Sequence, residues 1–189
     1  FRDVSAVWGV AIDGRYDTCA FADIDHDGLL DLYVNGTVSA TESFRDYLFV
    51  GATTTTGTAF VEVTPDNLLA LTASHGVQWA DVDGDGQLDL LVGARAHAGR
   101  YPETAKTVLL PGRVEGWGEA QTVTEGVRAN GAVFTDVDGD GDPDLVLAGD
   151  WDTLRLFRND RGRWVEATAE SGLGAWRGLW NGVSAGDFD

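Results

Sequence analysis

The sequence predicts an all-β fold, and three observations support this prediction. Twenty-five glycines among 189 residues indicate many turns, while only four prolines are present. Short apolar runs of the length and composition of strands lie between the glycine-containing segments, and no stretch has the spacing of an amphipathic helix. An acidic segment recurs along the chain, which indicates repeated structural units.

The recurring segment follows the template D-x-D-x-D-G-x-x-D-L. Complete copies occupy residues 23–32, 81–90 and 136–145, and a fourth begins at Asp187 and is cut off at Asp189. The first aspartates of successive copies lie 58, 55 and 51 residues apart, so the period drifts. A drifting period of this length is typical of a repeated structural unit with loop insertions rather than of a short tandem sequence.

Four strands are predicted in each unit. One strand ends at the acidic loop, a second begins directly behind it, and two more follow. The strands expected after the loops are Leu32–Val34, Leu90–Val92 and Leu145–Leu147, and the later ones are Tyr47–Val50, Phe60–Val63, Thr107–Leu110, Ala120–Val123, Leu154–Phe157 and Trp164–Ala167. The units are therefore expected at roughly 16–64, 76–124 and 130–168, with a truncated fourth starting near 181.

Four antiparallel strands in units of about 55 residues predict a β-propeller, in which small sheets are arranged radially. A propeller commonly has about four to eight such blades. The chain has room for about three blades plus parts of flanking ones. We therefore expect residues 1–189 to form one partial β-propeller, a partial ring, and the start at Phe1 without a methionine suggests a processed chain or an excerpt.

The acidic loop predicts a calcium site. Carboxylates at positions 1, 3, 5 and 9 and a backbone carbonyl at position 7 surround one hard cation with oxygen, and the glycine at position 6 permits the sharp turn. Carboxylates held this close repel one another unless a cation or protons neutralise them. Six to eight oxygen ligands at about 2.3 to 2.6 Å suit Ca²⁺ better than Mg²⁺, and no Cys or His cluster offers a zinc site.

Three other interpretations of the loop are weaker. An EF-hand requires a bidentate Glu at position 12, where this chain has Val34, Val92 and Leu147. Nonapeptide calcium repeats are excluded because the period is far longer than nine residues. An acidic turn that binds nothing would explain a single copy, but three matching copies argue against it.

These loops and their flanks resemble the FG-GAP or VCBS repeats of integrin α-subunit propellers. Segments 156–160 and 164–173 are similar to the inter-blade segment of cartilage-acidic-protein-like and bacterial VCBS proteins. The resemblance implies an integrin-α type of propeller and an extracellular or cell-surface location. It places the calcium ligands at Asp23, Asp25, Asp27, the Leu29 carbonyl and Asp31; at Asp81, Asp83, Asp85, the Gln87 carbonyl and Asp89; at Asp136, Asp138, Asp140, the Asp142 carbonyl and Asp144; and at Asp187 and Asp189 of the truncated loop.

The charge of the chain narrows the choice of partner. Thirteen Lys and Arg against 31 Asp and Glu give a net charge of −18, which argues against nucleic acid or an anionic membrane surface. Fifteen of the acidic residues lie in the four loops. No apolar run approaches the roughly 18 residues that a membrane span requires.

We expect a non-enzymatic, calcium-stabilised extracellular scaffold that acts in adhesion or assembly and binds a protein or glycan ligand or further copies of itself. Two alternatives stay open: a carbohydrate-binding or polysaccharide-processing propeller, and the repeat unit of an extracellular filament. A glycosidase needs a pair of carboxylates across a cleft, and the acidic residues outside the loops show no paired arrangement.

Single residues give further expectations. Cys19 is expected to be a small buried residue, because one cysteine has no partner for an internal disulfide. Asn35-Gly36-Thr37 is an N-glycosylation sequon in an expected surface loop, and Thr53–Thr56 is a candidate for O-linked sugar. His26 occupies a loop position where the other copies have Gly, so we expect it to point outward.

Overall fold

The computed structural model describes residues 1–36, 45–55, 57–65, 73–96 and 102–187, and these residues form an all-β structure. Thr37 of the sequon, Thr56 and the expected ligand Asp189 lie outside the described residues. Each acidic loop joins the first two strands of an antiparallel four-stranded sheet. The four strands expected in each unit are present.

Each sheet is an antiparallel meander in which neighbouring strands follow one another along the chain. The first consists of β1 (Tyr16–Ala22), β2 (Asp31–Gly36), β3 (Tyr47–Thr54) and β4 (Gly57–Glu62). The second consists of β5 (Ala73–Ala80), β6 (Asp89–Ala96), β7 (Thr107–Leu110) and β10 (Gln121–Thr124), with the hairpin β8 (Gly112–Arg113) and β9 (Gly116–Trp117) inserted before its last strand. The third consists of β11 (Ala129–Thr135), β12 (Asp144–Thr153), β13 (Arg155–Asp160) and β14 (Arg163–Glu166), and β15 (Arg177–Leu179) pairs with the far end of β12.

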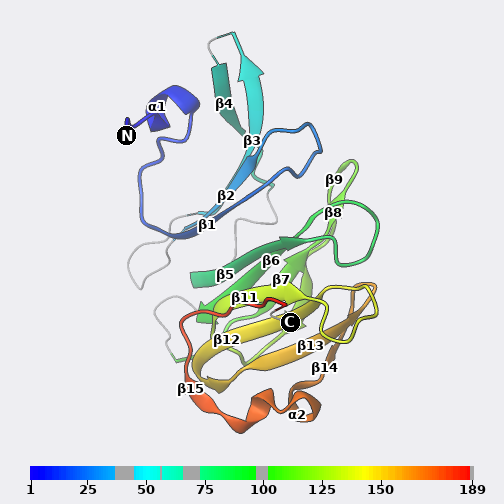
Figure 1. Ribbon diagram of the computed structural model, residues 1–189. Helices are drawn as coiled ribbons and strands as arrows, with labels where there is room; N and C mark the ends of the chain where they lie inside the picture. The colour runs from blue at the N-terminus through cyan, green and yellow to red at the C-terminus, as the bar shows by residue number, and fades with distance from the viewer. Residues whose placement is uncertain (37–44, 56, 66–72, 97–101, 188–189) are drawn as a thin grey trace.

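The three sheets follow one another in space in the order of the sequence (Figure 1). One apolar core lies between the first and second sheets and contains Tyr33, Leu48, Leu90 and Val108. A second core lies between the second and third sheets and includes Leu91, Leu109, Leu145 and Phe157. The middle sheet is thus buried on both faces, because alternate residues of β6 point to opposite sides.

Close backbone approach occurs between the first strands of successive sheets. A Cβ atom added at Gly76 of β5 would lie 3.2 Å from the Ala132 nitrogen of β11. A Cβ atom at Gly131 of β11 would lie 2.9 Å from the Cα atom of Gly182 in the C-terminal segment. Glycine permits this close approach, because a side chain at either position would press on the neighbouring backbone.

The helices in the described residues are two single α-helical turns and one 3-10 turn. The turns α1 (Ser5–Trp8) and α2 (Thr168–Ser171) end at Gly9 and Gly172, both with left-handed backbone, and η2 (Leu173–Ala175) follows α2. They were not predicted, because a four-residue helix is too short to show helical periodicity. Within the described part of the chain, no helix has the length and apolar character needed to cross a bilayer.

Two predictions about single residues were wrong. Cys19 is exposed on β1, because it faces away from the second sheet. Asn35 is fully buried within β2 rather than in a surface loop, and its Nδ2 donates to Asp46 at 2.8 Å.

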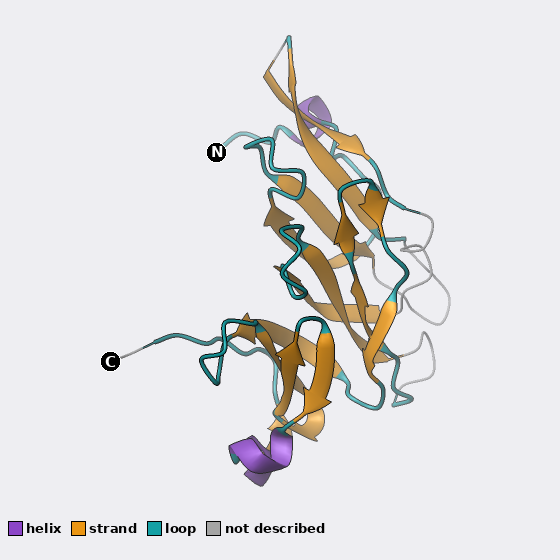
Figure 2. Cartoon of the chain, turned by 90° about the vertical axis from the view of Figure 1, so that its right-hand side faces the viewer, coloured by secondary structure: helices purple, strands orange, loops and turns teal. Residues whose placement is uncertain are grey.

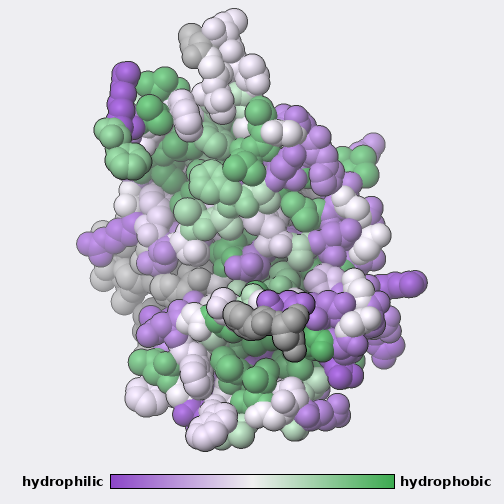
Figure 3. Space-filling model, viewed as in Figure 1, coloured by the Kyte–Doolittle hydropathy of each residue, from purple (hydrophilic) through white to green (hydrophobic). Residues whose placement is uncertain are grey.

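The outward face of the first sheet is apolar. Phe21 on this face is 55% exposed, and it lies beside a cavity of about 350 Å³ that Cys19, Leu32 and Ile12 also line. Hydrophobic residues gather over the upper part of the molecule in Figure 3.

Candidate metal centre

The three acidic loops lie on one side of the stack of sheets, at the right of Figure 1 and toward the viewer in Figure 2. Each loop connects the first strand of a sheet to the second. Neighbouring loops and turns lie close together. His26 Nε2 lies 2.9 Å from the Gly86 carbonyl of the second loop, and a Cβ atom added at Gly162 of the third sheet would lie 3.3 Å from the Asp83 Cβ atom. His26 is exposed as expected, but it also contacts this neighbouring loop.

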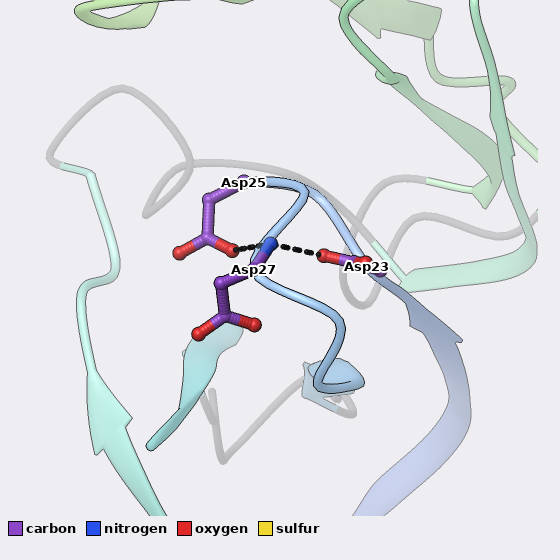
Figure 4. Close-up of side chains that lie close together, drawn as sticks. All are labelled: Asp23, Asp25 and Asp27. Atoms are coloured by element: carbon purple, nitrogen blue, oxygen red, sulfur yellow. Dashed lines mark hydrogen bonds between the residues drawn. The ribbon is translucent and has the colours of Figure 1, made fainter. Parts of the chain in front are cut away.

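Three carboxylates converge in each loop. In every group one oxygen from each residue lies within 4.8 Å of the others, and the groups are Asp23, Asp25 and Asp27; Asp81, Asp83 and Asp85; and Asp136, Asp138 and Asp144. Figure 4 shows the first group, with the backbone nitrogen of Asp27 between the carboxylates of Asp23 and Asp25. These distances bring the acidic oxygens into range of one shared cation.

Backbone amides orient the first and fifth carboxylates in the same way in all three loops. The Oδ2 atom of position 1 accepts from the glycine amide at position 6, at 3.0, 2.9 and 3.0 Å for Asp23, Asp81 and Asp136. The Oδ1 atom of position 5 accepts from the amide at position 7, at 2.8, 2.9 and 2.9 Å for Asp27, Asp85 and Asp140. The loop backbone therefore positions these side chains even where the intervening residues differ.

The ninth position has a structural role that the sequence did not reveal. The Oδ2 atom of the aspartate at position 9 accepts a hydrogen bond from the backbone amide at position 2 of the same loop. Its Oδ1 atom accepts a second hydrogen bond from a backbone amide in the third strand of the sheet or directly after it. The distances to that second amide are 2.7 Å from Gly51 to Asp31, 2.8 Å from Gly112 to Asp89 and 2.9 Å from Asn159 to Asp144. Each of these aspartates is at most 1% exposed. Because its two oxygens bind an amide of the loop and an amide of the sheet, it clamps the loop onto the sheet.

The environments of these carboxyls shift their pKa values in opposite directions. Burial raises the pKa of Asp89 to about 6, and the negative charges of Asp83 and Asp85 add to the rise. Burial likewise raises the pKa of Asp31. Hydrogen bonds from backbone amides, of which that of Gly139 has the largest effect, lower the pKa of the exposed Asp136. Burial therefore disfavours the charged form at the clamp, and hydrogen bonds favour it at the loop surface.

Among the described residues, two arginines are paired with the acidic loops. Arg113 Nη1 lies 2.8 Å from Asp85 Oδ2 and 3.2 Å from Asp83 Oδ2 in the second loop. Arg158 Nε lies 3.4 Å from Asp138 Oδ2 in the third loop. Within the described ranges, no Lys or Arg forms an ion pair with the first loop's three converging carboxylates.

The structure places the predicted ligands unequally. It brings together nine aspartates, one group of three per loop, as given above. Asp31, Asp89 and Asp140 lie outside those groups, whereas Asp144, at the same ninth position as Asp31 and Asp89, belongs to the third group. Leu29, Gln87 and Asp142 lie at the seventh position, and ligation through their carbonyls stays a prediction. Asp187 lies in the described C-terminal segment.

Two residues near the loops were missed by sequence reasoning. Asn159, which is 3% exposed, donates from Nδ2 to the Val82 carbonyl at 2.7 Å and so ties the third sheet to the second loop. Arg113 is the cation paired with that loop. Neither lies near its partners in the sequence, since 77 residues separate Asn159 from Val82. No local pattern could have identified them.

The donor set fits a hard divalent cation. Carboxylate oxygens are the ligands that Ca²⁺ and Mg²⁺ prefer, and the groups contain no sulfur or imidazole ligand. The guanidinium of Arg113 acts as a stand-in cation, since it lies against two carboxylates of one group. The residues present could thus hold a metal ion in each of the three loops.

Comparison with known proteins supports the resemblance seen in the sequence. Residues 136–189 match the family model of the FG-GAP-like repeat, a segment that runs from the first aspartate of the third loop to the end of the chain. A search of curated proteins found no match to the chain. The predicted similarity to FG-GAP repeats is therefore confirmed for residues 136–189.

Proposed function

We propose that this chain, which contains an FG-GAP-like repeat at residues 136–189, is a non-enzymatic repeat scaffold that binds one calcium ion in each of its three acidic loops. Repeats of this family are typically non-enzymatic. The convergence of three carboxylates within 4.8 Å in each of three loops is the observation on which the proposal rests. Three ions would change the net charge from −18 to −12.

Calcium would act on stability. A bound ion supplies positive charge between carboxylates that otherwise repel one another. Because each loop joins the first two strands of a sheet, and its ninth residue clamps it to the third strand or the turn beyond it, a neutralised loop holds three parts of the sheet together. A ligand that binds only the folded state raises its stability by mass action.

We further propose that the three sheets are consecutive blades of a partial propeller. The residue two places before each loop supports this arrangement. Trp79 packs on the core between the first and second sheets, and Phe134 packs on the core between the second and third. Phe21, at the same position in the first sheet, is 55% exposed. We infer that this apolar face packs against a further blade.

The proposed setting is outside the cell or on its surface, where calcium is plentiful. A scaffold with structural calcium would present its surface loops to a protein or glycan ligand, or to further copies of itself. Its strongly acidic surface favours partners that are not polyanions, since polyanions would be repelled.

Calcium counting by native mass spectrometry, combined with thermal melting, tests the proposal. We expect three bound ions in the wild type and a lower melting midpoint in chelator. The triple variant Asp25→Asn, Asp83→Asn and Asp138→Asn should lose binding, because each amide keeps only one of the two acceptor oxygens and no charge.

The matched control is Glu115→Gln, Glu119→Gln and Glu170→Gln, which removes the same charge from exposed positions outside the loops. It should still bind three ions. A wild type with no bound ion at millimolar calcium, and with a midpoint that chelator does not change, would overturn the proposal.

A further inference from the structure

We infer that Arg113 is an internal competitor for calcium at the second loop, so that the three proposed sites differ in affinity. Its guanidinium Nη1 lies 2.8 Å from Asp85 Oδ2 and 3.2 Å from Asp83 Oδ2, two of the three carboxylates that converge there. This inference rests on the proposed calcium function, because a competitor has meaning only where the ion binds.

The backbone holds Arg113 in this position. Its neighbour Gly112 donates to the clamping carboxylate of Asp89 at 2.8 Å, and this bond fixes the start of the β8–β9 hairpin beside the loop. Arg113 Nη1 also donates to the Gly112 carbonyl at 2.6 Å. The Asp89–Gly112 hydrogen bond, which orders the loop, thus also holds the Arg113 guanidinium beside the loop.

The other two loops lack a residue of this kind. Gly51 and Asn159 occupy the place of Gly112 in the first and third sheets, and the residues that follow them are Ala52 and Asp160. In the third loop Arg158 reaches Asp138 alone, at 3.4 Å and with a half-exposed side chain. Competition is therefore strongest at the second loop and absent, within the described residues, at the first.

A calcium ion that enters the second loop must displace the guanidinium from both carboxylates. The apparent affinity equals the intrinsic affinity multiplied by the fraction of molecules in which the arginine has already left the site. A partly exposed ion pair of this kind weakens the apparent calcium affinity by about fivefold. The first loop should therefore fill before the second as calcium rises.

A site-resolved titration tests this inference. The amides of Gly28, Gly86 and Gly141 each donate to the first carboxylate of their own loop, so their NMR signals report the three sites separately. In Arg113→Gln the calcium midpoint of Gly86 should fall by about fivefold relative to the wild type. The midpoints of Gly28 and Gly141 should stay unchanged. Arg113→Lys, which keeps one positive charge, should give an intermediate Gly86 midpoint.

The matched control is Lys106→Gln, which removes the same charge at the opposite end of the second sheet, where Lys106 pairs with Glu125. It should shift all three midpoints equally or not at all. If Arg113→Gln shifts Gly86 no more than Lys106→Gln does, the inference is wrong while calcium binding stands. If none of the three glycine signals responds to calcium in the wild type, the proposed function itself fails.

Discussion

The carboxylate of Asp89 accepts a hydrogen bond from the Gly112 amide at 2.8 Å, and this bond joins the second acidic loop to the segment that follows the third strand of its sheet. The other oxygen of Asp89 accepts from the Val82 amide at 2.9 Å. Asp31 and Asp144 make the corresponding pairs of bonds in the other sheets. The ninth loop position thus serves the fold before any ion is considered.

Replacement of Asp89 by alanine should destabilise the protein even when calcium is removed. The variant leaves two buried amides, those of Val82 and Gly112, without an acceptor, and each such group costs about 1–3 kcal/mol. We expect a loss of about 3 kcal/mol in the free energy of unfolding, measured by urea denaturation in chelator. The control Asp27→Asn, at the fifth position of the first loop, should change stability in chelator by less than about 0.5 kcal/mol, because an amide oxygen still accepts from Leu29. Equal losses in the two variants would contradict the clamp.

Replacement of Gly131 by alanine should loosen the packing between β11 and the C-terminal segment. The new methyl group would lie 2.9 Å from the Gly182 Cα, which is backbone and has no side chain to move aside. We expect a loss of about 1–3 kcal/mol in urea denaturation. Gly182→Ala is the matched control, since a Cβ atom there meets nothing within 4 Å and should leave stability nearly unchanged. The prediction fails if the two alanine variants are equally stable.

The sequence was sufficient to predict the strands and the three acidic loops between them. Both depend on local patterns, namely short apolar runs and a template in which positions 1, 3, 5 and 9 carry carboxylates. The partners of those carboxylates depend on tertiary packing. Arg113 lies 28 residues from Asp85, and only the clamp at Gly112 brings the two together.

Burial of single residues could not be predicted for the same reason. Cys19 corresponds to Val77 and Ala132, which are each 6% exposed because a preceding sheet covers them. The strand pattern is the same in all three sheets, and it does not say which sheet has a neighbour. Asn35 was misplaced because a sequon suggests a surface loop, whereas β2 includes Asn35 and Gly36.

The thiol of Cys19 should react in native residues 1–189 when no further blade is packed on the apolar face of the first sheet. Cys19 is exposed on the apolar face of the first sheet. We expect a colorimetric disulfide reagent to modify one thiol per chain without denaturant, at a rate within about tenfold of a free thiol. If modification required urea, another part of the protein or a second copy would have to cover this face.

The stability contributed by Asp46 should fall as pH rises. Its carboxyl is 3% exposed and accepts from the Tyr33 hydroxyl at 2.7 Å and from the Asn35 and Gly36 nitrogens at 2.8 Å. Burial raises the pKa of Asp46 above its ordinary value of 3.8, and these donors only partly offset the rise. The folded state therefore keeps its proton in a pH range where the unfolded chain has lost it. The contribution is fully present below the unfolded pKa and is lost as pH rises through the folded pKa.

Asp46→Asn cannot ionise, yet its amide oxygen still accepts a hydrogen bond, so it isolates this titration. The unfolding free energy of the wild type minus that of Asp46→Asn should decrease as pH rises from about 4 through the raised pKa of the folded state, by about 1.4 kcal/mol for each unit by which the pKa is raised. Urea denaturation of both proteins at each pH, with calcium held constant, measures this difference, and the protonation of the acidic loops cancels because both proteins contain them. A difference that stays constant or increases with pH would show that the three donors, rather than burial, control the Asp46 carboxyl.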